Sequence, residues 1–151
     1  MSEGASRRLL MLATDGSPAS EKATAYAIDR AKEGGARLIV MMVVDPTMVG
    51  GLAAQGASEV DLAKEIERDA HKAVDAAVAR ATEEGVDVKG HVIKLGVGED
   101  VAAAVARFAY DHRVNVIFVG SHGRTGMLAV MLGSTAEKIV KVARCPVSVI
   151  R

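Results

Sequence analysis

The sequence predicts a doubly wound α/β fold built on one five-stranded parallel sheet, and three observations support this prediction. Apolar runs of strand length alternate with helical patterns along nearly all of the 151 residues. No turn signal joins two consecutive apolar runs as a hairpin, so the strands run parallel and right-handed crossovers place helices on both faces. The length suits one domain, and residues 1–151 are therefore expected to form a single domain.

The first strand and the first helix are separated by a turn with a clear sequence signature. The apolar run 8–14 has strand length, and the turn Asp15-Gly16-Ser17-Pro18 follows it directly. Ser17 is placed to cap a helix, and Pro18 suits the first helical position. Alanines then recur at helical spacing until Gly34-Gly35 stops the helix.

The longest connection in the chain lies between the second strand and the second helix. Residues 37–44 are apolar on both faces, as expected for a central parallel strand. Residues 60–84 carry one apolar stripe over the length of a long helix. Between them, residues 45–59 contain three glycines and no helical stripe, which predicts a flexible loop. This loop is a lid or binding loop on one interpretation and a tolerated insertion on the other.

The second half of the chain continues the same alternation. The expected elements are a weaker strand at 86–95, a helix around 101–109, a strand at 114–119, a helix at 134–144 and a last strand at 146–150. The first of these strands has one polar face, which is typical of a strand at the edge of a sheet.

Composition argues against several classes of partner and site. The 19 basic and 19 acidic residues cancel, and aromatic residues make up 3% of the chain, so neither nucleic acid nor a membrane surface is an expected partner. The N-terminus lacks the long apolar region of a signal peptide, and we expect a cytoplasmic protein. Cys145 is the single cysteine, which excludes an internal disulfide, and we interpret it as a small buried hydrophobic residue.

A glycine-rich segment follows the strand 114–119. Gly120 and Gly123 let the backbone turn sharply and approach a ligand, and Gly133 and Ser134 open the last helix. A helix N-terminus with free N–H groups suits a phosphate. Taken alone, the segment supports two interpretations equally, because Ser134 with Glu137 also forms an ordinary capping box.

The spacing Gly120-x2-Gly123-x9-Gly133-Ser134 resembles the ATP-binding motif of the universal stress protein family. The surrounding sequence, VGSHGRTG and LGSTAEKIVKVARCPVSVI, is similar to the C-terminal half of proteins in that family, and LLMLATDGSPAS is similar to their first strand and turn. The resemblance covers essentially the whole chain. It implies a flavodoxin-like, Rossmann-like fold with strand order 3-2-1-4-5 and membership of the subgroup that carries the glycine motif and binds ATP.

The resemblance also implies a set of site residues around the nucleotide. Asp15 and Gly120 are expected near the ribose, and Val43 beside the adenine. The full set expected to bind the cofactor is Ala13, Thr14, Asp15, Val43, Gly120, Ser121, His122, Gly123, Arg124, Gly133, Ser134 and Thr135. The expected ligand is ATP, with ADP and AMP as related candidates, and Mg²⁺ or Mn²⁺ shared between phosphate oxygens and water.

Several of these residues also have an ordinary structural interpretation. Asp15 alone is a common turn residue, and only the resemblance favours a ligand role. Arg124 either reaches a phosphate or is solvated, and His122 is better interpreted as packing or facing water than as a general base. The remaining histidines are dispersed and are expected to be exposed: His71, His91 and His112.

The expected function is that of an ATP-binding stress-response and signalling protein, in which the nucleotide switches the affinity for an unknown protein partner. The chain has no Walker motif and no acidic cluster for two metals, so no catalytic residue is assigned. The alternative is a slow ATPase or phosphotransferase that uses the same site. A receiver domain would need an aspartate at the end of the third strand, where this chain has Lys94-Leu95-Gly96.

The last strand is expected to form an interface. In the order 3-2-1-4-5, residues 146–150 lie at an edge, where unpaired backbone groups must be covered. Members of the family commonly dimerise through this strand, so the resemblance implies an isologous homodimer.

Overall fold

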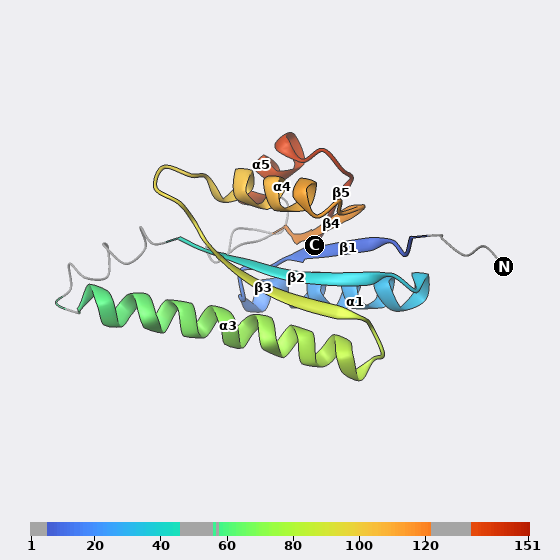
Figure 1. Cartoon of the computed structure of the whole chain (residues 1–151), viewed down its shortest axis with the longest axis horizontal. Helices are drawn as coiled ribbons and strands as arrows, with labels where there is room; N and C mark the ends of the chain where they lie inside the picture. The colour runs from blue at the N-terminus through green and yellow to red at the C-terminus, as the bar shows by residue number, and fades with distance from the viewer. Residues whose placement is uncertain (1–5, 46–55, 57, 122–133) are drawn as a thin grey trace.

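A computed structural model of the chain describes residues 6–45, 56, 58–121 and 134–151. Its centre is a five-stranded sheet in the order β3-β2-β1-β4-β5, in which every neighbouring pair is parallel. The strands are β1 (Leu9–Ala13), β2 (Arg37–Val44), β3 (Val88–Lys94), β4 (Val116–Gly120) and β5 (Val147–Ile150). Figure 1 shows them with the helices above and below. The predicted fold class and strand order are confirmed.

The helices follow the predicted positions with two local corrections. They are η1 (Pro18–Ser20), α1 (Glu21–Gly34), α3 (Glu59–Glu83), α4 (Val101–Asp111) and α5 (Ser134–Val142). The first helix opens with the 3₁₀ turn η1, and Ser17 at its N-cap position makes no capping hydrogen bond, because its hydroxyl donates to Asp15 instead. The predicted last helix, 134–144, ends two residues early, at Val142.

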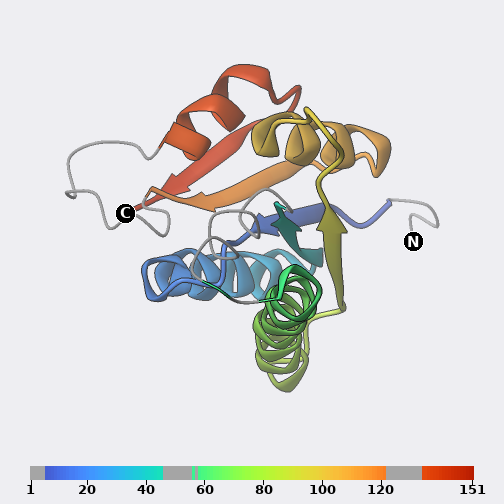
Figure 2. The ribbon, with the colours of Figure 1, turned by 90° about the vertical axis from the view of Figure 1, so that its left-hand side faces the viewer.

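The sheet separates two hydrophobic cores, and β1 shows how the sequence builds both. Leu10 and Leu12 belong to the core under α1 and α3, whereas Met11 and Ala13 belong to the core under α4 and α5. Side chains alternate between the faces of a strand, so a continuous apolar run supplies both layers. Figure 2 shows the two helix pairs on opposite sides of the sheet. β1 is therefore buried along most of its length at the centre of the sheet, and the turn that follows it starts from this position.

The helices that lead into β2, β3 and β4 all end in the left-handed backbone region, but not with the same residue type. α1 is followed by Gly35 with φ +60°, and α3 by Gly85 with φ +80°. After α4 the corresponding residue is Arg113, with φ +55°, the one described non-glycine residue with positive φ. An L side chain is disfavoured in this region, so Arg113 is held there at some cost.

One prediction about the histidines is wrong. His91 is half-buried, because β3 presents it to α4, where its ring lies edge-on to Phe108 at 5.1 Å between centroids. His112 stacks on the same phenylalanine at 3.8 Å and lies 5.9 Å from His91. Burial lowers the pKa of His91, and the nearby His112 and Lys89 lower it further. His71 and His112 are exposed, as predicted.

Candidate functional site

The carboxyl ends of β1 and β4 form the point of the sheet where ligands are expected. These strands are neighbours, with Ala13 opposite Val119. The chain leaves β1 toward α1 on one face, and α5, which precedes β5, packs on the other face. Ligands in doubly wound sheets bind where the connections diverge in this way. We call this region the carboxyl edge; it comprises residues 13–16, Val43, Gly120 and Ser121.

A network of hydroxyl groups fixes the backbone that follows β1. The Thr14 hydroxyl donates to Ser20 Oγ at 3.0 Å and accepts from the Gly16 N–H at 3.1 Å. Ser20 in turn donates to the Ser17 carbonyl at 2.7 Å, and Thr24 donates to the Ser20 carbonyl at 3.1 Å. Ser20 and Thr24 are buried, so these bonds are protected from water and hold the turn against α1.

Ser20 was not among the predicted site residues. Its hydroxyl connects Thr14, just after β1, to the carbonyl of Ser17 in the turn. The available signal was the spacing of hydroxyl residues at positions 14, 17, 20 and 24. Once the turn closes, this spacing places them side by side.

Asp15 fills the role of a turn residue. Its Oδ1 accepts from the Ser17 N–H at 2.9 Å and from the Ser17 hydroxyl at 2.6 Å, which is the pattern of an Asx turn. Asp15 is half-buried at the carboxyl edge, immediately after Thr14. The structure thus places a carboxylate at the end of β1, oriented by its own turn.

Gly16 is the point where the turn touches α3. Its φ is +74°, and a Cβ added there would lie 3.1 Å from the Cβ of Ala73 and 3.6 Å from Cε of Met42. Both the backbone conformation and the close approach favour glycine. The sequence pattern Asp-Gly therefore reflects a tertiary contact with α3 as well as a local turn.

Small aliphatic side chains line one face of the carboxyl edge. Ala13, Val43 and Val119 lie on the α4 and α5 face, from three adjacent strands. Ala13 pairs in register with Met41, so Val43 extends beyond the end of β1. Val43 is half-buried, whereas the other two are buried. The predicted Ala13 and Val43 are thus brought together on one face with Asp15 close behind in sequence.

Gly120 and Ser121 continue the ladder between β4 and β5. Gly120 lies opposite Ile150, and the Ser121 N–H donates to the Ile150 carbonyl at 2.8 Å. Ser121 is only 2% exposed, so its side chain is part of the interior. Thr14 donates its N–H to the Met41 carbonyl at 3.0 Å, and both strand ends are therefore anchored by backbone bonds.

The remaining predicted residues belong to the segment between β4 and α5. Four of them lie outside the described residues: His122, Gly123, Arg124 and Gly133. Ser134 and Thr135 are the first two residues of α5, and both are exposed. The capping interpretation of Ser134 with Glu137 and the phosphate interpretation both depend on residue 133, so both stay open. The predicted loop 45–59 also lies largely outside the described residues.

Groups suited to covalent or metal chemistry are sparse in the described part of the chain. No group of three or more His, Cys, Asp or Glu residues there could hold a metal ion. Cys145 is half-buried, and burial raises the pKa of its thiol, which leaves it a poor nucleophile at neutral pH.

No described helix has both the length and the apolar character needed to cross a membrane.

Comparison with known proteins places these features in a family context. A model described as the universal stress protein family matches residues 7–151. Universal stress protein MJ0531 of Methanocaldococcus jannaschii is 35% identical over 144 residues, which cover 94% of this chain and 81% of the relative. A crystal structure of a family member from Burkholderia pseudomallei is 28% identical, with a TM-score of 0.75 and coverage of 97% and 98% of the two chains. The Archaeoglobus fulgidus universal stress protein in complex with dAMP shares the fold, with 19% identity, a TM-score of 0.68 and coverage of 97% and 98%.

Proposed function

The chain belongs to the universal stress protein family, and on that premise we propose that it binds an adenine nucleotide, with ATP preferred, at the carboxyl edge. The observation that carries the proposal is the placement of the Asp15 turn beside Gly120, on adjacent strands whose connections diverge. A structurally similar family member was solved with dAMP, which supports an adenine nucleotide as the class of ligand.

The aliphatic face is the proposed seat of the base. Ala13 and Val43 offer a slot without aromatic groups or charges, and an adenine ring buries apolar surface against such side chains. Thr14 lies beside this slot, with its hydroxyl and its N–H already engaged in the protein. We therefore propose that Thr14 contributes to the shape of the slot and makes no hydrogen bond to the base.

Asp15 is the proposed partner of the ribose. A carboxylate accepts hydrogen bonds from hydroxyl groups, as Asp15 already does from Ser17, and this is the chemistry that ribose hydroxyls need. Gly120 has no side chain and lets the sugar approach the end of β4. The neighbouring Ser121 supports this strand end from the interior.

The phosphates are proposed to lie at the start of α5. The motif residues expected there are His122, Gly123, Arg124, Gly133, Ser134 and Thr135. The positive end of the α5 dipole and free N–H groups at a helix start suit phosphate oxygens. Mg²⁺ or Mn²⁺ would be held by the phosphates and water, since the described residues offer no group of metal ligands.

The proposed consequence of binding is a switch rather than a reaction. ATP would bias the segments that contact it, and through them the affinity for a protein partner, by the difference in its affinity for the two states.

We also propose a homodimer through β5, because this strand lies at the edge of the sheet and its apolar residues are half-buried. Light scattering should give the mass of a dimer at tens of micromolar, and a monomer would refute the dimer.

Mass spectrometry of nucleotide released from the purified protein, followed by thermal shifts with ATP, ADP, AMP and GTP, tests the nucleotide site. ATP at 100 times its dissociation constant should add about 2.7 kcal/mol to the free energy of unfolding. Asp15→Asn keeps a turn acceptor but removes the charge, and it should weaken ATP binding by about tenfold. Asp75→Asn, an exposed aspartate on α3, is the matched control and should leave binding unchanged.

Two outcomes would contradict the proposal. No bound nucleotide and no thermal shift with any of the four nucleotides would refute the site itself. Turnover faster than about one ATP per minute, lost in Asp15→Asn, would instead favour an enzyme, although a typical enzyme turns over about 10 times per second.

A further inference from the structure

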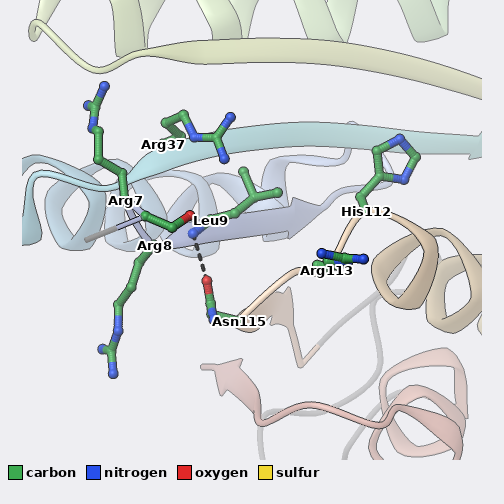
Figure 3. A pocket seen from close by; sticks show the side chains of 8 residues that line it. Arg7, Arg8, Leu9, Arg37, His112, Arg113 and Asn115 are labelled. Atoms are coloured by element: carbon green, nitrogen blue, oxygen red, sulfur yellow. Dashed lines mark hydrogen bonds between the residues drawn. The ribbon is translucent and has the colours of Figure 1, made fainter. Parts of the chain in front are cut away.

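A pocket lies at the end of the sheet opposite the carboxyl edge, where β1, β2 and β4 begin. It has a volume of about 330 Å³, and its lining includes Arg7, Arg8, Arg37 and Arg113 (Figure 3). We call this region the amino edge; it comprises residues 6–9, Arg37 and the segment 112–115. The chain as a whole has no net charge, so four arginines in one pocket are a local concentration of positive charge.

Three of these four guanidinium groups are not used inside the described part of the protein. Arg7 is engaged, since its Nε donates to the Gly35 carbonyl at 3.1 Å and its terminal nitrogen lies 3.3 Å from Oδ2 of Asp87. The side chains of Arg8, Arg37 and Arg113 make no hydrogen bond or ion pair with any described residue. Their donors are therefore not used by the described part of the protein. The Arg8 side chain points to the side of the chain opposite Arg7 (Figure 3), so Arg37 and Arg113 are the two arginines that we assign to a ligand.

The backbone at Arg113 gives independent support for a role in binding. Arg113 sits at φ +55° after α4, at a helix end where α1 and α3 use glycine. The strain is retained although glycine would relieve it. The conformation puts a guanidinium on the α4–β4 side of the pocket, across from Arg37 on β2 (Figure 3).

The remaining lining indicates a ligand that consists mostly of charge. Among the described residues that line the pocket, Leu9 is the one apolar residue, so these residues form no slot for a base or an acyl chain. Asn115 uses its Oδ1 to accept from the Leu9 N–H at 2.8 Å, which leaves its amide NH₂ as a further donor. No described carboxylate lines the pocket, and Asp87 is held by Arg7.

We propose that the amino edge is a second binding site, for a compact anion with several phosphate groups such as an inorganic oligophosphate. The planar fork of a guanidinium matches two phosphate oxygens at once, and groups on opposite sides of the pocket would engage successive phosphates. Nucleic acid is disfavoured by the zero net charge and the scarcity of aromatic residues. The site is separate from the carboxyl edge and does not depend on nucleotide binding there.

Calorimetric titration of the full chain with inorganic tripolyphosphate at low salt tests this proposal. Saturable binding is expected. Arg37→Gln and Arg113→Gly should each weaken it by roughly threefold or more, since each removes an exposed charge partner. Arg68→Gln is the matched control, because it removes the same charge from an exposed site on α3 and should leave the dissociation constant unchanged. Binding should also weaken on raising the salt to physiological strength.

A further variant separates this site from the nucleotide site. Gly133→Ala alters the proposed phosphate segment and should leave tripolyphosphate binding at the amino edge intact. Loss of binding in Gly133→Ala with no loss in the arginine variants would place the anion at the carboxyl edge and overturn the proposal. The absence of saturable binding, or an equal loss in Arg68→Gln, would overturn it as well. Failure of ATP to bind would leave the proposal standing, because its test uses no nucleotide.

Discussion

The two ends of the same sheet are built for ligands in different ways. At the carboxyl edge, charge is scarce, and the groups in place are backbone, hydroxyls and small side chains around Asp15 and Gly16. At the amino edge, four arginines line a pocket and the backbone groups at the strand starts are paired, with Arg37 N–H bonded to Arg8 and Asn115 N–H to Leu9. A parallel sheet thus offers backbone and dipole recognition at one end, while at the other it must rely on side chains.

The two ends differ most clearly in the residue that each places in the left-handed backbone region. At the carboxyl edge the left-handed position after β1 is Gly16, where an added Cβ would make a tight 3.1 Å contact with Ala73. At the amino edge the left-handed position before β4 is Arg113, which carries a long charged side chain despite the conformational cost. Space is tight at Gly16, whereas Arg113 lies at the pocket that we propose to bind an anion, where a charged side chain would contact the ligand.

The largest expected effect tests the steric demand at the carboxyl edge. Gly16→Ala should lower the free energy of unfolding by about 2–3 kcal/mol, because it adds a left-handed L residue and a close contact with Ala73. Gly98→Ala is matched in φ, at +74°, but meets no atom within 4 Å, and should cost about 1 kcal/mol. Equal losses in urea denaturation would show that the contact with α3 is unimportant.

A smaller effect tests the hydroxyl network. Ser20→Ala removes the acceptor of Thr14 and the donor to the Ser17 carbonyl in a buried site, and should destabilise by about 1–2 kcal/mol. A double-mutant cycle with Thr14→Val should give a coupling free energy of about 0.5–1 kcal/mol. Strict additivity would mean that the 3.0 Å bond between the two hydroxyls contributes nothing.

At the amino edge, a substitution at the left-handed position should raise the free energy of unfolding rather than lower it. Arg113→Gly should stabilise the fold by about 0.5–1 kcal/mol, because glycine relieves the left-handed strain. The same variant should weaken tripolyphosphate binding. Gly85→Ala, at the equivalent helix end after α3, should destabilise by about 1 kcal/mol. A loss of stability in Arg113→Gly would indicate that the arginine is structural.

The smallest effect concerns the histidines beside the amino edge. The folded-state pKa of His91 is below its ordinary value of 6.5, so the unfolded chain binds more protons near that pH. The free energy of unfolding therefore loses no stability through His91 above about pH 6.5, and it decreases as the pH falls from there through the folded-state pKa. Between pH 8 and 5.5, the Tm of His91→Leu should fall less than that of the wild type. His71→Leu, at an exposed position, should retain the wild-type dependence.

Local pattern was enough to predict the elements, and topology explains what it missed. The runs that became β1, β2 and β4 are apolar on both faces, and their bounds agree with prediction to within two residues. The order of the strands came from the family resemblance, because the alternation of strands and helices is compatible with several orders. The turn at Asp15 and Ser17 was predictable because its bonds are local.

The features that sequence reasoning missed depend on contacts between distant segments. His91 meets Phe108 because β3 faces α4, and no local pattern reports that contact. The arginine pocket draws on residues 7, 8, 37 and 113, which are scattered in sequence and share only their position just before or at a strand start. With the strand order known, that shared position would have indicated the cluster.

Titration of isotope-labelled protein with ATP, followed by amide chemical shifts, tests whether the nucleotide binds at the carboxyl edge. Binding there should give saturable shifts at the amides of Thr14, Gly16 and Gly120, at ATP concentrations that leave Arg37 and Asn115 unmoved. Carboxyl-edge amides that stay in place at millimolar ATP, or shifts confined to the amino edge, would contradict it.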